Sequence, residues 1–491
     1  MSTITLSING KRVECPAAYP LTRAPEAGDL IQVFHYAIVL QPGDAGRQWV
    51  TAPEGLFEQR GAVLTPVAVT VADTTTLADL SPAQRARLRC VLIRRWHPSA
   101  EALLADTDPS RCVYVIVGGF DPPSERRTPD KAVVRRLPPI PAGCRHLLIS
   151  DTSYSRLITY DWERLAGLTA LETLTLSAFF TDLRPLCGMR RLRALSAVYS
   201  RAESLQPLSE LHQLRQLELR NSTVQDLSPL SALVRLEVLS LSFCRGRVSL
   251  APLSVLPALR HLYANAIDVT ALPAGGWPAL AHLEVLSAQL PEGEVAALRA
   301  AHPRCVVHAD WAERFSGAVV GADRLRVRTG GTCHRKPDQE RTLAEHGHDG
   351  VASFLRDLCI VPGPTDDEID RLAGQILQRH GIDDGDGPLS GAEADAVRQD
   401  RRLGASLRGW EGALDRAAIR AAAGRYLLRD FRCRCCGDPT FEVYAGDRLL
   451  AMVGFHHGET VRWSGWPADA SLQPGAAQRL RSLIPADYLL Q

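Results

Sequence analysis

The stretch Leu-Ser-Pro-Leu-Ser-Ala-Leu-Val-Arg-Leu-Glu-Val-Leu-Ser-Leu, residues 227–241, decides the fold of this chain. Its leucines recur every three residues and then, at Leu239 and Leu241, after two. A spacing of three suits a short helical or 3₁₀ turn, whereas a spacing of two is the period of a β-strand. The Pro-Leu pair at its start returns at Leu186, Leu208, Leu230 and Leu253, at intervals of 22, 22 and 23 residues. The middle of the chain is therefore predicted to be a tandem repeat of one turn and one strand.

The strand part of the unit has the form Leu-x-x-Leu-x-Leu, which occurs at 171–176, 214–219 and 236–241. This pattern resembles the leucine-rich repeats, and in particular the 22-residue bacterial class that includes the internalins. The resemblance covers about six units, from Leu165 to Leu286. It implies a solenoid with a parallel sheet on its concave side, since one unit cannot bury its own leucines and stacking supplies the core.

The two ends of the solenoid and its turns are less regular. Cys144–Ile149 is expected to form a first strand, and Ala297–Val307 a closing turn. The asparagine that usually follows the repeat strand is mostly missing, although Asn221 lies near that position in one unit. The geometry of the turn after the strand therefore stays open.

Side chains that alternate with the paired leucines are predicted to point out of the concave face. Aromatic, arginine, histidine and carboxylate side chains together are typical of an interaction surface, while a merely solvated sheet is the alternative. The residues predicted to bind a protein or peptide partner are Tyr199, Gln216, Glu218, Arg220, Phe243, His261, Tyr263, Asn265, His282 and Glu284, with Thr173, Thr175, Ser240 and Ser242 on the same face.

The composition limits the choice of partners and compartment. The chain has 56 basic and 55 acidic residues, so its net charge of +1 gives no overall attraction for nucleic acid or an anionic membrane. Its first residues lack a secretion signal, no apolar run is long enough to span a membrane, and most cysteines stand alone. These features predict a cytoplasmic protein with reduced thiols.

We predict an α/β chain of three domains. A β-rich or α+β domain at 1–143 and an α+β domain at 311–491 flank the solenoid at 144–310, and the last domain contains a helical insertion at 365–405 and a β-meander at 431–466. In the first domain, Ser81 is predicted to cap a helix that runs to about Arg95.

The insertion resembles the calcium loop of an EF-hand. A helix with Thr365 and Glu368 as a capping box precedes it, and Gly381 is placed to end that helix. Gly387 and Leu389 match the turn and apolar positions of the loop, and the resemblance implies Asp384, Asp386, Ser390 and Glu393 as Ca²⁺ ligands. The first ligand position departs from the pattern because it is Ile382. Weak Ca²⁺ binding and a solvated acidic turn are both left open.

A second candidate metal site lies in the meander. Cys433 and Cys436 have the Cys-x-x-Cys spacing of zinc ligands, and a hairpin turning near Gly446 would bring Cys436 opposite His456. The interpretations are a structural Zn²⁺ site or a buried cluster of thiols, because no second pair of ligands has a matching spacing. The adjacent Cys333 and His334 are interpreted as part of a turn at the end of a strand.

Two functions from different classes follow. The first is a scaffold that holds a protein or peptide in the concave face, with the EF-hand-like loop as a calcium-dependent modifier of that binding. The alternative is a metal-dependent enzyme or protein-maturation factor that uses the Cys and His residues of the last domain. A catalytic metal needs three protein ligands and an open position, and no spacing in the sequence defines such a set.

Overall fold

The computed structural model describes most of the chain as two compact units. The first contains Met1–Cys244, Val248–Leu262 and Ala271–Ala281, and the second contains Arg245–Arg247, Tyr263–Thr270 and His282–Gln491. The residues outside the description are 1–2, 9–10, 17–29, 34–35, 43, 45–47, 53–54, 61–62, 72–74, 95–99, 119–132, 152–157, 203, 274–275, 289, 291–292, 330–340, 359, 362–365, 384–386, 401, 408–412, 431–436, 457, 459, 464, 467–468, 473–474 and 485–491.

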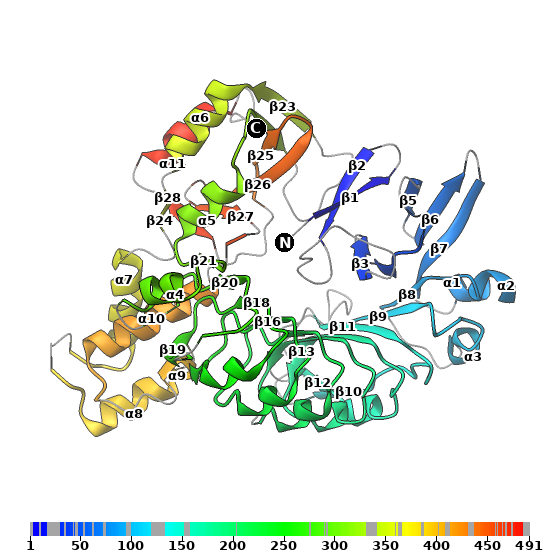
Figure 1. Cartoon of the computed structure of the whole chain (residues 1–491), viewed down its shortest axis with the longest axis horizontal. Helices are drawn as coiled ribbons and strands as arrows, with labels where there is room; N and C mark the ends of the chain where they lie inside the picture. Colours follow the sequence, from blue (N-terminus) through cyan, green and yellow to red (C-terminus); the bar gives the residue numbers. More distant parts are fainter. Residues whose placement is uncertain are drawn as a thin grey trace. The chain divides into compact units, whose positions relative to one another are not determined.

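The first unit is built on a parallel sheet that runs through the solenoid, and Figure 1 labels several of its strands. Neighbouring strands pair in parallel in the order β7 (Val63–Val71), β8 (Cys90–Ile93), β9 (Val113–Gly118), β11 (His146–Asp151), β13 (Thr173–Phe180), β14 (Ala194–Ser200), β15 (Gln216–Glu218) and β16 (Val238–Ser240). The parallel sheet therefore does not begin with the repeats. It already includes β7, β8 and β9, which come before residue 143. The predicted fold, a leucine-rich-repeat solenoid with a parallel sheet, is confirmed.

The register of the sheet aligns equivalent leucines from one repeat to the next. Leu147, Leu174, Leu195, Leu217 and Leu239 are partners in five adjacent strands. Each is at most 1% exposed, so these side chains form a continuous row in the core. A shift by one residue would turn the whole row to the solvent, and burial therefore specifies the register.

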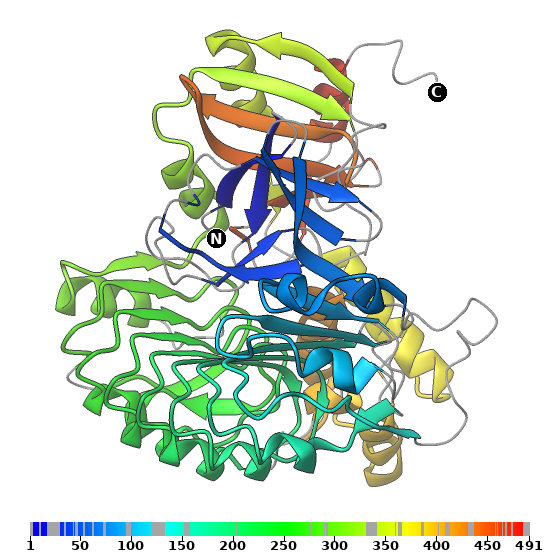
Figure 2. The ribbon, with the colours of Figure 1, turned by 90° about the vertical axis from the view of Figure 1, so that its right-hand side faces the viewer.

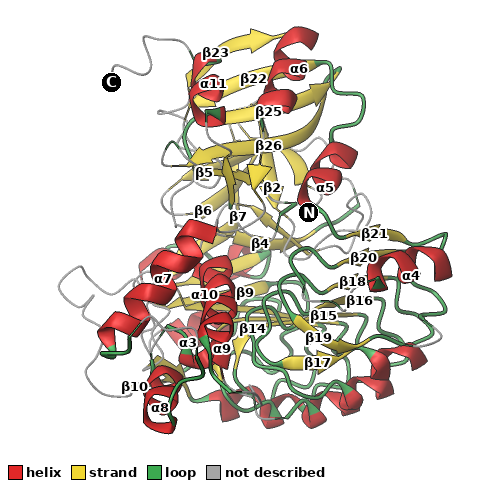
Figure 3. Cartoon of the chain, turned by 90° about the vertical axis from the view of Figure 1, so that its left-hand side faces the viewer, coloured by secondary structure: helices red, strands yellow, loops and turns green. Residues whose placement is uncertain are grey.

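The Pro-Leu pairs form the predicted 3₁₀ turns. Proline occupies the first turn of each helix, where no intrahelical N–H is needed, and the leucine after it is buried. Figure 3 shows these short helices in a row along the edge opposite the strands. They are η3 (Arg184–Leu186), η4 (Gln206–Glu210), η5 (Ser228–Ala232) and η6 (Ala251–Val255), preceded by η2 (Trp162–Leu165).

Three repeats have a left-handed residue at or just after the end of the strand. Tyr199, Asn221 and Phe243 are 22 residues apart and have φ of 69°, 59° and 62°. Only Asn among these three adopts such a backbone readily, so the tyrosine and phenylalanine are held there by the surrounding repeats. In the second unit, Ala266 and Ser287 have φ of 52° and 55°.

In two repeats, the residue after the left-handed position takes the place of the expected asparagine. Ser222 is 1% exposed, and its Oγ donates to the Ala197 carbonyl at 2.9 Å and accepts from the Ser200 N–H at 3.0 Å. One repeat later, Cys244 Sγ lies 3.0 Å from the Leu219 carbonyl oxygen. The side chain that bonds the preceding repeat is thus Ser or Cys rather than Asn, and it follows Asn221 instead of being Asn221.

Ser222→Ala is expected to lower the free energy of unfolding by about 1 to 3 kcal/mol, because it leaves a buried N–H and a buried carbonyl without their partner. Urea unfolding followed by far-UV circular dichroism measures this change. Ser231→Ala is the matched control, since Ser231 Oγ bonds the Ser228 carbonyl at 2.7 Å on the exposed side of a repeat. Equal losses in the two variants would show that the buried bonds of Ser222 contribute no more stability than the exposed bond of Ser231.

Antiparallel strands precede the parallel sheet. β5 (Gln48–Ala52), β6 (Gly55–Arg60) and β7 pair in succession, β1 (Thr3–Ile8) pairs with β2 (Lys11–Pro16), and β3 (Leu30–Val33) pairs with β4 (Tyr36–Val39). Figure 2 shows this part of the chain in blue. The remaining short elements are α1 (Thr75–Ala78), α2 (Pro82–Arg85), α3 (Ala100–Leu104), β10 (Val133–Arg135), β12 (Ile158–Tyr160), β17 (Arg247–Ser249), β18 (His261–Tyr263) and β19 (Asp268–Ala271).

The helix predicted to run from Ser81 to about Arg95 is wrong in length. Ser81 does form a capping box with Gln84, but the helix ends at Arg85. The apolar run Cys90–Ile93 instead becomes β8, a strand that is buried throughout. Pairing with β7 and β9 outweighs the local preference of these residues.

The second unit combines the last repeat with an antiparallel sheet. β20 (His282–Glu284) pairs in parallel with β21 (Val306–His308), and α4 (Glu294–Ala301) and α5 (Trp311–Ala318) follow β20 and β21. The antiparallel sheet has the order β23 (Arg341–His346), β22 (Arg324–Thr329), β25 (Thr440–Ala445), β26 (Arg448–His456), β27 (Thr460–Trp463), β28 (Ala470–Leu472) and β24 (Ile360–Val361). Figure 1 shows α6 (His348–Asp357) and α11 (Ala476–Ser482) beside this sheet.

A tryptophan-rich core joins the elements of this unit. Trp311 and Phe315 on α5 contact Trp466, with ring centroids 5.9 Å and 5.4 Å away, and Trp466 Nε1 donates to the Trp311 carbonyl at 3.0 Å. Trp463 on β27 packs edge-on against Phe315 at 5.0 Å. Helix α5 is therefore fixed against the antiparallel sheet by aromatic packing.

Four helices form a separate small core within this unit. They are α7 (Asp366–Arg379), α8 (Gly391–Gln399), α9 (Gly404–Leu407) and α10 (Arg416–Asp430). Leu372, Ile376 and Leu377 of α7 pack there with Val397 of α8 and Ile419 of α10. Among the helices in the described ranges, none is long and apolar enough to cross a membrane.

Candidate functional site

The predicted concave residues alternate with buried leucines along the repeat strands. In β15, Gln216 and Glu218 are partly exposed on either side of Leu217, and in β18 His261 and Tyr263 flank Leu262 in the same way. Of the ten residues predicted to bind a partner, Tyr199, Gln216, Glu218, Arg220, His261, Tyr263 and His282 are half-buried, whereas Phe243, Asn265 and Glu284 are buried. The three buried residues contact other members of the set: Phe243 packs against Arg220, and Glu284 bonds Asn265 and His282.

Aromatic and arginine side chains gather at the strand ends of the first unit. We call this set, namely Phe179, Tyr199, Arg201, Arg220 and Phe243, the strand-end row. The Phe179 and Tyr199 rings are 6.3 Å apart, and the Arg201 guanidinium lies 5.5 Å from the Phe179 ring. Arg220 lies 5.1 Å from the Phe243 ring. Both contacts are cation–π pairs, which combine a flat apolar surface with positive charge.

Glu218 neighbours this row but its carboxylate is already bonded. Ser196 on β14 donates its hydroxyl to Glu218 Oε2 at 2.7 Å. Burial lowers the pKa of Arg220, and the negative charge of Glu218 raises it in opposition. Ser196 and Arg201 were not predicted as site residues. Aligning the repeats would have found Ser196, because it occupies the same strand position as Glu218.

Glu284 is the centre of a hydrogen-bonded network in the second unit. Its Oε1 accepts from His282 Nε2 at 3.1 Å and from Arg314 Nε at 2.9 Å, and its Oε2 accepts from Asn265 Nδ2 at 3.2 Å. Asn265 Oδ1 also accepts from the Leu286 N–H at 2.8 Å. The network ties the last repeat strands to helix α5, which carries Arg314.

The donors around Glu284 determine its ionisation. Burial would raise the pKa of this carboxyl, but the hydrogen bond from His282 and the charge of Arg314 outweigh burial and hold the pKa at about 2. Glu284 is only 5% exposed, so its charge is neutralised by its own neighbours. Such a carboxylate orients its donors and offers little to a ligand.

Three rings lie in sequence beside this network. Tyr263 and His282 have centroids 5.5 Å apart, and His282 and His308 are 5.1 Å apart. Burial raises the pKa of Tyr263 to about 12, so its hydroxyl stays protonated. Burial and the nearby charge of Arg314 lower the pKa of His308, which favours the neutral imidazole. His308 and Arg314 belong to the site but follow the repeats, so no periodicity pointed to them.

The solved structures that are similar to this chain include three internalins. An internalin (inlF) from Listeria monocytogenes shares 16% identity over 48% of this chain and 70% of its own, with a TM-score of 0.36. Internalin C2 from the same species shares 19% over 50% of this chain and 81% of its own, with a TM-score of 0.27. The functional domain of InlJ from Listeria monocytogenes shares 15% over 46% of this chain and 51% of its own, at 0.30. No protein-family profile and no curated protein matches the chain.

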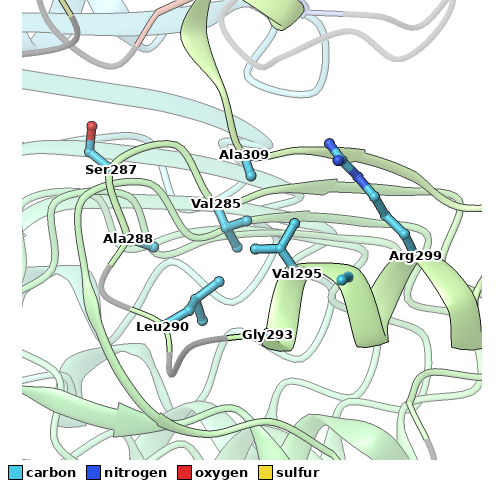
Figure 4. A pocket seen from close by; sticks show the side chains of 9 residues that line it. Val285, Ser287, Ala288, Leu290, Gly293, Val295, Arg299 and Ala309 are labelled. Carbon is cyan, nitrogen blue, oxygen red and sulfur yellow. The ribbon is translucent and has the colours of Figure 1, made fainter.

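A depression of about 750 Å³ opens beside the last repeat, within the second unit. Figure 4 shows Val285 and Val295 pointing toward one another, with Leu290 below them. Arg299 lies at its margin, but its guanidinium is bonded to Glu313 at 2.8 Å and to the Val307 carbonyl at 3.1 Å. The walls are therefore mainly apolar.

The ends of the EF-hand-like loop act as helix caps. The Ile382 N–H bonds the Leu377 carbonyl and the Gly381 N–H bonds the Gln378 carbonyl, which is the Schellman arrangement with Gly381 at φ 67°. Gly381 therefore ends α7 as predicted, and the Ile382 side chain is buried.

The far end of the same loop begins the next helix. Ser390 caps α8, and the Glu393 carboxylate accepts from the Ser390 N–H at 2.8 Å. Asp384 and Asp386 lie outside the described residues, so Ca²⁺ binding by this loop stays a prediction.

The hairpin predicted near Gly446 is confirmed, because β25 and β26 pair up to Ala445 and Arg448. His456 at its far end is 1% exposed, and its Nε2 lies so close to Gly437 that a Cβ at that glycine would be 2.4 Å away. Gly437 also has φ of 63°, so two independent constraints require glycine there.

The other two predicted zinc ligands, Cys433 and Cys436, lie outside the described residues. The predicted turn at Cys333 and His334 also lies outside them. Within the described ranges, no group of three or more His, Cys, Asp or Glu side chains is arranged to hold a metal ion. Zn²⁺ binding by Cys433, Cys436 and His456 therefore stays a prediction.

Proposed function

We propose that this chain is a scaffold that binds a protein or an extended peptide through the concave face of its repeats. The observation that carries the proposal is the alternation in the repeat strands, which buries leucines and leaves polar and aromatic side chains at the surface. These side chains come from successive repeats, so they form a long series of contacts and no single catalytic centre.

The composition of this face supports binding. Tyrosine, phenylalanine and arginine are the residues that most often dominate binding energy at protein interfaces. In the first unit they occur together in the strand-end row, and in the second Tyr263 stands beside the His282 ring, which in turn lies beside His308. Both groups are held by packing before any partner arrives, which lowers the entropy lost on binding.

We also propose that the scaffold works in a reducing compartment such as the cytoplasm. Cys90, Cys112, Cys144 and Cys244 are buried free thiols. Burial raises the pKa of Cys90 and Cys144 to about 12, which keeps both thiols protonated and unreactive.

A photo-crosslinking amino acid at Thr175 is expected to trap a partner in producing cells, because Thr175 is half-buried on the concave side of β13. The same group at Val234, which is 52% exposed on the other side of a repeat, is the control. Replacing Tyr263 and Arg220 together by alanine should reduce the adduct formed at Thr175 several-fold, with the melting temperature little changed. Equal adducts from Thr175 and Val234, or none from Thr175, would contradict a concave binding face.

A further inference from the structure

Arg220 carries a positive charge that the described chain does not pair. Within the described residues its guanidinium has no salt bridge and its Nε, which is enclosed by protein, has no hydrogen-bond partner. The guanidinium contacts the face of the Phe243 ring, at 5.1 Å from its centroid. A guanidinium has five N–H donors, and the contact with the ring face uses none of them.

The neighbouring carboxylate does not meet this need. Glu218 lies two residues earlier on the same strand and its Oε2 is occupied by the hydroxyl of Ser196. Glu218 acts on Arg220 through its charge alone, without the contact of an ion pair. The second unit shows the opposite arrangement, because there the buried Glu284 has a histidine, an asparagine and an arginine as donors. Buried charges are normally paired in this way.

We infer that Arg220 receives a carboxylate side chain of the bound segment, so that the partner of this scaffold is an acidic peptide. The inference rests on the proposed function and names the chemistry of its ligand. A carboxylate matches the fork of a guanidinium with two parallel hydrogen bonds, and the Phe243 ring packs against this guanidinium. Tyr199 and Phe179 extend the same surface, so an apolar or aromatic neighbour of the acidic residue also finds contact.

The partner is a peptide because the row is narrow and regular. Successive repeats place Tyr199 and Phe243 at equivalent positions with a spacing of 44 residues, which is two repeats, with Arg220 belonging to the repeat between them. Neighbouring strands of a sheet are about 4.8 Å apart, so the part of the row from Tyr199 to Phe243 spans roughly 10 Å. An extended segment of three or four residues covers that length.

A library of random dodecapeptides displayed on phage tests the inference, with the full chain as bait. Peptides selected by the unmodified chain should be enriched in Asp and Glu, and an Arg220→Gln bait should lose that enrichment. Arg235→Gln is the matched control, because it removes the same charge from an exposed position. Arg235 is bonded there to Gln213 at 2.7 Å. Arg220→Lys, which keeps the charge without the fork, should select acidic peptides weakly.

A titration with the best peptide completes the test. Exchanging its acidic residue for the amide should weaken binding to the unmodified chain about tenfold or more, and should change binding to Arg220→Gln very little. Circular dichroism of each variant establishes that it is folded.

Each outcome has a distinct meaning. Selected peptides without an acidic excess, or an equal excess from the Arg220→Gln bait, would overturn the acidic-peptide inference while leaving the concave face as a binding surface. If the unmodified chain enriches no peptide at all, both the inference and the peptide-binding function fail.

Discussion

Leu239→Ala is expected to lower the free energy of unfolding by about 3 to 5 kcal/mol, the upper part of the range for a leucine in a rigid core. The Leu239 side chain is fully buried and follows Leu217 in the row of aligned leucines. A solenoid is stabilised by contacts between neighbouring repeats, so a cavity in this row weakens the interfaces of the altered repeat with its neighbours. The backbone on both sides is held by strand pairing, which limits collapse into the cavity.

Urea unfolding followed by circular dichroism measures this loss. Val234→Ala is the control, because Val234 is 52% exposed in the same repeat and its truncation should change stability by less than about 0.5 kcal/mol. A loss of similar size in both variants would mean that the leucine row is not the main source of stability.

Arg314→Met is expected to destabilise the chain by about 3 kcal/mol, since it removes the cation from a buried ion pair. Arg314 Nε lies 2.9 Å from Glu284 Oε1, and the Glu284 side chain is 6% exposed. Methionine retains the apolar part of the side chain against Trp463, whose ring lies 5.4 Å from the guanidinium. The remaining donors, His282 and Asn265, do not compensate a buried carboxylate fully.

The same variant is expected to change how stability depends on pH. The pKa of Glu284 falls from 4.5 to about 2 on folding, so this carboxylate contributes stability above pH 4.5 that is lost as the pH falls toward 2. The full shift corresponds to roughly 3 kcal/mol. In Arg314→Met the folded pKa rises, so the loss of stability between pH 4.5 and 2 becomes smaller.

Unfolding in urea at a series of pH values between 2 and 7 tests this change. Arg215→Met is the control, because its ion pair with Glu237 spans 3.2 Å between side chains that are 55% and 40% exposed, and such a pair contributes at most about 1 kcal/mol. If the free energy of unfolding falls equally between pH 4.5 and 2 in Arg314→Met and in the unmodified chain, Arg314 does not have the role given to it.

The repeats could be predicted from the sequence because each leucine position recurs. Leu186, Leu208, Leu230 and Leu253 identify the turns, and the Leu-x-Leu pairs identify the strands. The extension of the sheet into β7, β8 and β9 could not be predicted in this way. Those strands are continuous apolar runs such as Cys90–Ile93, whose position depends on their neighbours and leaves no periodic signal.

The turns after the strands show a different limit. Asparagine is the expected residue for a left-handed turn, yet Tyr199 and Phe243 occupy that backbone state. Tertiary structure holds them there. The small buried residues after them differ in their bonds: Ser200 Oγ accepts from the Ala202 N–H in its own turn, whereas Cys244 Sγ bonds the Leu219 carbonyl of the preceding repeat. Residue type alone therefore pointed only to the neighbourhood of Asn221, and the residue that makes the buried bonds is Ser222.

The candidate site was predictable where it follows the repeat and not elsewhere. Glu218, Arg220 and Tyr263 come from strand positions, and the alternation of the strand gives their direction. Arg314 belongs to a helix after the last repeat, and its contact with Glu284 spans 30 residues of sequence. Only the folded chain reveals that pairing, or that Arg220 stays unpaired among the described residues.

The aligned leucines have a consequence for how such a chain can evolve. Leu195, Leu217 and Leu239 meet the same kind of neighbour on each side, so the core contains no marker of how many units precede or follow. Duplication or loss of one unit in the gene would preserve the leucine contacts of this row while lengthening or shortening the surface above it. The length of the surface that contacts a partner can therefore change during evolution in steps of one repeat.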